Sequence, residues 1–169
     1  MSLNQIQLTN ELLAHLYNDK LVEGVHTNAV PEAVPQMTQQ IKHLGNGAKR
    51  IALLVDYAGV PFIPDGDLNF LTNVLQACKL SMADVALINI NTHSPAETSK
   101  YLQELEMKQV ILFGLQPAVL DLPIHFPPFQ LQAFAGCIYL CSPSLPELQQ
   151  QKDLKLQLWN SLKKLFGLE

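Results

Sequence analysis

From residue 51 onward, short continuous apolar runs alternate with segments whose apolar residues recur every three to four positions. Continuous runs of this length are typical of parallel strands covered on both faces, and the three-to-four spacing predicts helices. Since strands and helices alternate, we expect an α/β domain with three αβα layers around a mainly parallel four-stranded sheet. The runs predict strands at 51–55, 85–90, 109–114 and 136–141.

Local signals support this order of elements. Ser94 and Glu97 form a capping-box pattern, and Ser144 with Glu147 repeats it. The last helix, predicted at 151–166, has apolar residues in register, and its Trp159 is expected in the core. Four prolines between 115 and 134 predict irregular chain there, with at most a short strand at 129–134.

The chain before this domain has a different pattern. We expect residues 1–47 to form a helical arm and linker, and residues 48–169 to form the α/β domain. Prolines and little periodicity indicate a linker at 23–36, and a second helical pattern covers 36–44. The arm either packs on the domain or docks on another protein, apolar side down. Its stripe consists of Leu8, Leu12, Leu13, Leu16 and Tyr17.

Composition excludes several classes of function. About half of the residues (48%) are apolar, yet no run is long enough to span a bilayer, so a membrane role is not expected. The N-terminus lacks the pattern of a secretory signal, which favours the cytoplasm. The three cysteines form no metal-ligand pattern, and the residues indicate no cofactor. Arg50 is the only arginine and the net charge is −4, so direct DNA binding is expected to be weak or absent.

Ligands of open α/β sheets bind outside the carboxyl ends of the strands. The residues at those ends are therefore candidates to line a ligand crevice. They are Asp56, Tyr57, Ala58, Gly59, Asn91, Gly114, Ser142 and Ser144.

The loop that follows the first strand, 56–67, allows two interpretations. In one, Asp56 or Asp65 positions a water molecule in a base pocket. In the other, Asp65 and Asp67 cap and turn the chain while Gly66 supplies a positive φ. His93 and His125 also lie at strand ends or in loops, but neither has an identifiable partner for catalysis.

Four features between residues 48 and 166 resemble the uracil-DNA glycosylase superfamily. An apolar strand runs into a proline-containing loop at 56–61, a strand ends in Gly114, and a strand runs into the triplet 142–144. A last helix with lysine and tryptophan follows. The resemblance implies the glycosylase fold and, if the protein is active, excision of uracil or a related base.

The departures from this pattern concern the chemical groups. The resemblance implies a polar residue in the first motif that positions water, and a histidine in the last motif that supports the leaving base. Tyr57 stands at the first place, with Asp56 one residue early, and Ser142 replaces the histidine. If the protein were active, its catalytic groups would come from Asp56, Tyr57, Asp65 and Ser142. The substitutions favour a fold from which catalysis has been lost.

The sequence also resembles the family of psi subunits of bacterial DNA polymerase III. Members carry Ser-Pro-x-Leu, a polar stretch and a helix with Leu-Trp, and this chain has 142–145 followed by Leu158 and Trp159. They also begin with a short leucine-rich segment and a flexible connection. The resemblance implies an N-terminal segment that docks on clamp-loader subunits and a domain that binds a chi-like subunit.

Three hypotheses remain open at this point. The chain is a non-catalytic accessory subunit of the replicative clamp loader, or a divergent glycosylase of DNA repair. As a third possibility, it is a small-molecule-binding or regulatory α/β protein, because a fold by itself does not fix a function.

Overall fold

The structure is a computed structural model that describes residues 41–123 and 125–168. The chain divides into two units, Met1–Thr38 and Gln39–Glu169, and the second holds all of the described residues. The predicted N-terminal helix at 8–17 and the predicted linker lie outside the described residues.

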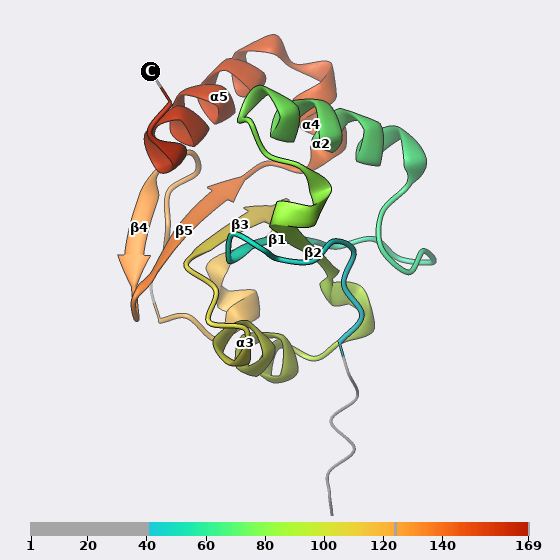
Figure 1. The fold of residues 1–169 in the computed structure, drawn as a ribbon, viewed down its shortest axis with the longest axis vertical. Helices are drawn as coiled ribbons and strands as arrows, with labels where there is room; N and C mark the ends of the chain where they lie inside the picture. The colour runs from blue at the N-terminus through green and yellow to red at the C-terminus, as the bar shows by residue number, and fades with distance from the viewer. Residues whose placement is uncertain (1–40, 124, 169) are drawn as a thin grey trace, which may run out of the picture. The chain divides into compact units, whose positions relative to one another are not determined.

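The predicted α/β class is confirmed (Figure 1). Helices α2, α4 and α5 lie on one face of a single sheet, and α3 lies on the other. The strands are β1 (Ile51–Val55), β2 (Val85–Asn89), β3 (Gln109–Phe113), β4 (Leu131–Phe134) and β5 (Cys137–Ser142). The helices are α2 (Asp65–Ala77), α3 (Pro95–Glu104), α4 (Leu145–Gln150) and α5 (Lys152–Phe166), with 3₁₀ turns η2 (Met82–Asp84), η3 (Ile90–Thr92) and η4 (Pro117–Leu120).

The prediction of a four-stranded sheet was wrong, because the sheet has five strands in the order β2-β1-β3-β5-β4. The first four of these run parallel, and β4 pairs antiparallel with β5 at the sheet edge. Ala135 and Gly136 both have positive φ, at 49° and 80°, and they reverse the chain in a two-residue turn between β4 and β5. The fifth strand is the short strand that the sequence allowed at 129–134, since β4 covers Leu131–Phe134.

Alternate residues of β1 supply two separate cores. Ile51, Leu53 and Val55 of β1 pack toward α2, α4 and α5. Ala52 and Leu54 pack on the other face with residues of α3 and η4. All five residues of β1 are at most 2% exposed, which explains why its sequence is apolar at every position.

The chain between residues 41 and 47 runs along the edge strand β2. Leu44 forms an antiparallel bridge with Leu87, with both backbone hydrogen bonds made, and Ile41 is buried in the core on the α3 side. The part of the predicted 36–44 helix that the structure describes is therefore extended. Pairing with β2 satisfies backbone groups that the edge would otherwise leave open, which outweighs the local helical pattern.

Gly45 makes this edge contact possible. Its φ is +96°, and a Cβ atom there would collide with the backbone oxygens of Met82 and Val85.

Within the described residues, no helix has the length and apolarity to cross a membrane.

We expect Gly45→Ala to lower the free energy of unfolding by about 3 kcal/mol, since the side chain adds both backbone strain and a steric clash. The matched control is Gly136→Ala, where φ is +80° but no atom lies within 4 Å of the added Cβ. That variant is expected to lose about 1 kcal/mol. Urea denaturation of both variants measures the difference, and equal losses would contradict the steric role of Gly45.

Candidate functional site

The four parallel strands end at one level, which brings the predicted crevice residues to a common edge. Val55 pairs with Asn89, and Phe113 pairs with Ser142, so each strand stops in line with its neighbour. Ser142 is the last residue of β5 rather than the first residue after it, because β5 spans 137–142 and not the predicted 136–141. The carboxyl edge is thus formed by the ends of β2, β1, β3 and β5 in that order.

Asn89 closes the end of β2 against the loop that follows β1. It is 1% exposed, and its amide nitrogen donates to the backbone oxygens of Tyr57 (2.8 Å) and Val60 (2.9 Å). Its side-chain oxygen accepts from the backbone nitrogens of Tyr57 (3.0 Å) and Asn91 (3.2 Å). Four contacts use the full capacity of an asparagine amide, so this side chain has nothing left to offer a ligand.

A second set of hydrogen bonds holds the same loop to the helical layer. The Tyr57 hydroxyl donates to one carboxylate oxygen of Asp67 at 2.5 Å, and the Gln149 amide donates to the other oxygen, also at 2.5 Å. Burial, and next the bond and charge of Asp67, raise the pKa of Tyr57 far above its usual range. The phenol is therefore neutral and committed to Asp67, which excludes it as a base that activates water.

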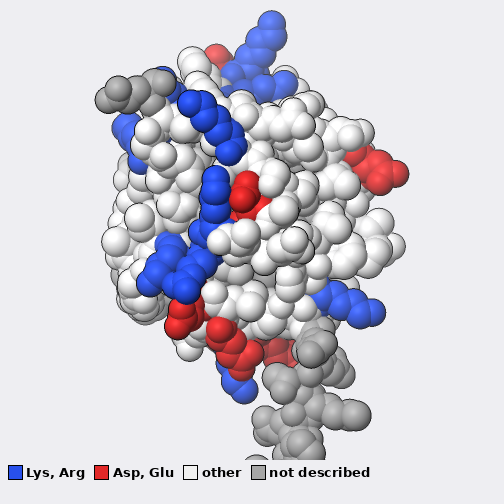
Figure 2. Space-filling model, viewed as in Figure 1, with Lys and Arg blue, Asp and Glu red and all other residues white. Residues whose placement is uncertain are grey.

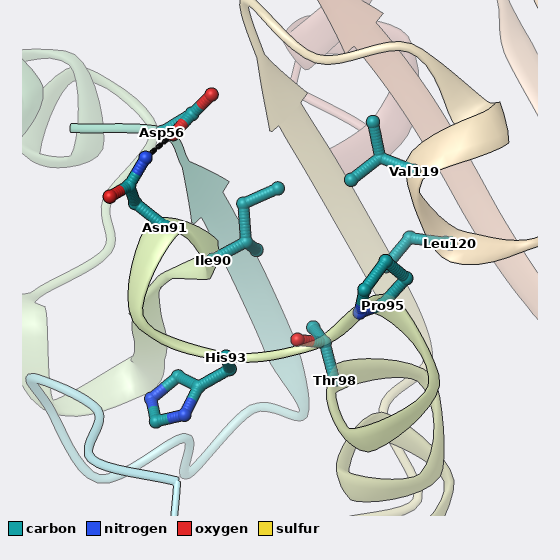
Figure 3. Close-up of a pocket in the computed structure, with 8 residues that line it drawn as sticks. All are labelled: Asp56, Ile90, Asn91, His93, Pro95, Thr98, Val119 and Leu120. Carbon is teal, nitrogen blue, oxygen red and sulfur yellow. Dashed lines mark hydrogen bonds between the residues drawn. The ribbon is translucent and has the colours of Figure 1, made fainter. Parts of the chain in front are cut away.

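The first hollow at this edge has a volume of about 180 Å³ and lies between the ends of β1 and β2, α3 and η4 (Figure 3). Asp56 and Asn91, both predicted crevice residues, meet there through a 2.8 Å hydrogen bond from the Asn91 amide. Ile90, Val119 and Leu120 supply apolar walls, and the ring of His93 points away from the two η4 residues. Asp56 is exposed, and its bond partner is an amide rather than a general acid or base.

A second hollow of about 420 Å³ lies at the ends of β3 and β5. Gly114 and Ser142 line it, and the backbone N–H of Gly114 donates to the Ser142 carbonyl at 2.8 Å. Gly114 has φ +68°, and a Cβ atom there would come within 3.0 Å of the Ser144 side chain. The chain needs glycine here because the two loops cross so closely.

Ser142 is the unusual residue of the second hollow. It is 5% exposed, and its hydroxyl oxygen is fully buried without a hydrogen-bond partner among the described residues. Cys141 also lines the hollow, but burial raises the pKa of its thiol to about 11, so it is protonated and not nucleophilic at neutral pH. His125 and Glu147 stand at exposed positions of the lining, and Glu147 already accepts from the Ser144 backbone N–H at 3.1 Å.

The two hollows share no lining residue, so the predicted crevice is divided. Asp56 and Asn91 belong to the first, and Gly114 and Ser142 belong to the second. Ala58 and Gly59 are exposed in the β1 loop and line neither of them. Of the four groups named as catalytic if the protein were active, Asp56 and Ser142 therefore lie in different hollows, and Tyr57 and Asp65 line neither.

The interpretation of the 56–67 loop as a capping and turning segment was wrong in two details. Asp65 and Asp67 do not cap α2, because Pro64 holds the cap position. Both carboxylates lie in the first helical turn, where their negative charge interacts favourably with the positive end of the helix dipole. Gly66 is helical, and the glycine with positive φ in this loop is Gly59. The capping boxes predicted at Ser94 and Ser144 are confirmed.

Sequence reasoning missed Asn89, Gln149 and the role of Asp67. Asn89 did leave a signal, since it is the one polar residue in the run 85–90, and a buried amide requires partners. Gln149 left none, because it lies 82 positions from Asp67 and its neighbourhood is set by packing.

The comparisons with models of known protein families and with curated proteins found no match. Among residues 41–123 and 125–168, no three His, Cys, Asp or Glu side chains gather in a way that could hold a metal ion.

Tyr57→Phe removes the bond to Asp67, and we expect it to lower the free energy of unfolding by about 1 kcal/mol at pH 7. The folded state keeps the Tyr57 proton above pH 10, where the unfolded chain releases it, so the stability contributed by the hydroxyl is present below about pH 10 and is lost as the pH rises further. The gap between wild type and Tyr57→Phe should therefore shrink above about pH 10. Denaturation at pH 7 to 11.5 tests this, and a constant gap would contradict it.

Ser142→Ala removes a buried hydroxyl that has no partner, and we expect the free energy of unfolding to stay unchanged or rise by up to about 1 kcal/mol. Ser161→Ala is the matched control: Ser161 is also 5% exposed, but its hydroxyl donates to the Phe129 carbonyl at 2.6 Å. That variant should lose about 1 kcal/mol or more. If Ser142→Ala lost as much as the control in urea denaturation, the hydroxyl would have a partner in solution.

Proposed function

We propose that this protein is a non-catalytic, protein-binding accessory subunit of the replicative DNA polymerase III clamp loader, similar to the psi subunit, with a uracil-DNA-glycosylase-like fold. Its N-terminal arm docks on the clamp-loader subunits, and its α/β domain binds a chi-like subunit. The proposal places the protein in DNA replication and in the cytoplasm.

The observation that carries the proposal is that polar groups at the carboxyl edge are already hydrogen-bonded to other residues of the protein. Tyr57 stands where a glycosylase would position water, and its hydroxyl is bound to Asp67, which in turn binds Gln149. The loop is thereby tied to α2 and α4 instead of being presented to a substrate. With Ser142 in place of the expected histidine, neither motif retains its chemical group.

The distribution of charge supports a protein partner over DNA. Asp56 and Asp65 are exposed on the loop that would have to approach a phosphate backbone. Figure 2 shows a narrow column of Lys and Arg side chains on one face, with acidic side chains beside and below it. Arg50 pairs with Glu106 at 3.0 Å, so the one guanidinium already faces a carboxylate.

The second hollow favours one other candidate function. A cavity of about 420 Å³ is within the size range of small-molecule sites, and a buried hydroxyl without a partner is a group that a ligand can satisfy. A small-molecule-binding protein would use this place. Binding of uracil or another small molecule that Ser142→Ala abolishes would favour this candidate over the clamp-loader subunit.

The test of the proposed function is reconstitution with purified clamp-loader core subunits and the chi-like subunit of the same organism. We expect the full chain to co-elute with both in gel filtration. Deletion of residues 1–20 should abolish binding to the core subunits and leave binding to the chi-like subunit intact, because arm and domain have separate partners.

A uracil-containing oligonucleotide serves as the control for catalysis. Release of free base by the full chain, lost in Asp56→Ala, would overturn the non-catalytic assignment. Failure of the full chain to bind either replication partner would overturn the assignment to the clamp loader.

A further inference from the structure

The helical layer formed by α2 and α5 has an apolar groove on its surface. The groove has a volume of about 280 Å³ and lies between the two helices, away from the carboxyl-edge hollows. Its lining is apolar except for Asn73 of α2 and Lys155 of α5. The apolar lining residues are Phe70, Val74, Ala77, Leu158, Trp159 and Leu162.

The floor and the walls of the groove differ in burial. Leu158 and Leu162 are each 2% exposed and belong to the core beneath. Phe70, Val74 and Trp159 are half-buried, so they pack on the core with one side and leave the other side open. Trp159, which the sequence places in the core, thus also contributes surface. Aromatic side chains in this position are the residues that most often dominate the energy of protein interfaces.

The spacing of the lining residues fits a helix as the occupant. On α2 the lining runs from Phe70 through Val74 to Ala77, and on α5 it runs from Lys155 to Leu162. Each set covers seven residue steps, or roughly 10 Å along the helix axis. That length accommodates two turns of a third helix, whose apolar residues at positions i, i+4 and i+7 would fill the groove.

The charge beside the groove indicates which residues should flank the apolar stripe of the partner helix. Lys155 is the single charged residue of the lining, and its ammonium lies 5.6 Å from the centre of the Phe70 ring. Helix α5 carries four lysines and one aspartate, and basic side chains, drawn blue, stand at the top of the face in Figure 2, where α5 lies in Figure 1. A partner helix with an acidic residue beside its apolar stripe would pair with Lys155 and match the sign of α5.

We infer that the groove between α2 and α5 is the docking site for an amphipathic helix with an acidic flank, presented by the chi-like partner of the domain. This inference rests on the proposed function, because that function supplies the partner. On this inference the partner helix contacts α2 and α5, and the carboxyl edge of the sheet takes no part in the contact.

The test is isothermal titration of the full chain with the purified chi-like subunit. Val74→Glu puts a carboxylate into the groove and should weaken binding by at least about 30-fold. Leu156→Glu is the matched control, since Leu156 is 59% exposed on the same helix and lies outside the groove lining. It should bind like wild type, and thermal melts show whether each variant is folded.

Lys155→Glu provides a second measure that does not depend on inserting a charge into an apolar wall. It should weaken binding by about 10-fold, and its association rate should fall less steeply with added salt than that of wild type. If wild type binds the chi-like subunit and Val74→Glu and Lys155→Glu bind equally well, the docking site is wrong while the proposed function stands.

Two other outcomes also decide against the inference. If wild type does not bind the chi-like subunit at all, the proposed function fails and the inference fails with it. If the protein instead self-associates in analytical ultracentrifugation and Val74→Glu abolishes the dimer, the occupant of the groove is a second copy of the chain.

Discussion

The whole described structure depends on the burial of β1 between two layers. This strand is apolar at all five positions and pairs with β2 and β3 on either side, so neither its faces nor its edges reach water. Along this strand, polar side chains can then stand only where it ends. The same constraint that builds the core therefore gathers the polar side chains at the carboxyl edge, where α/β proteins place their binding sites.

At that edge a buried polar group costs free energy unless it binds the protein, water or a ligand. Asn89 and Asp67 bind the protein, and through them the β1 loop is joined to β2, α2 and α4. Ser142 has no partner among the described residues. The half of the edge near β1 is consequently closed by internal bonds, and the half near β5 keeps one unsatisfied group beside a cavity.

This division gives the proposed function its physical basis. Under the proposed function, the polar groups of the β1 loop stabilise the fold, and recognition takes place on the helices. On α2 and α5 the same side chains serve two purposes, since Phe70 and Trp159 cover the core with one side and offer apolar surface with the other. Under the proposed function, this helical surface is what the protein partner contacts.

The sequence by itself determined the elements whose pattern is local. The apolar runs gave the α/β class, and the pairs Ser94–Glu97 and Ser144–Glu147 located two helix starts, because these signals lie within a few residues of each other. Tertiary structure decided the rest. The extended chain at 41–47 and the bond between Asp67 and Gln149 both depend on neighbours far away in sequence.

The loop at 56–67 shows the same limit at the candidate site. Its aspartates and its place after a buried strand could be recognised in the sequence, and so could the substitution of Tyr57 and Ser142 for the expected groups. The donors that bind the two carboxylate oxygens of Asp67 could not be recognised, because the packing of α2 and α4 on the sheet determines these partners. A residue's type is written in the sequence, but whether its polar atoms remain free for a ligand is fixed only when the distant elements come together.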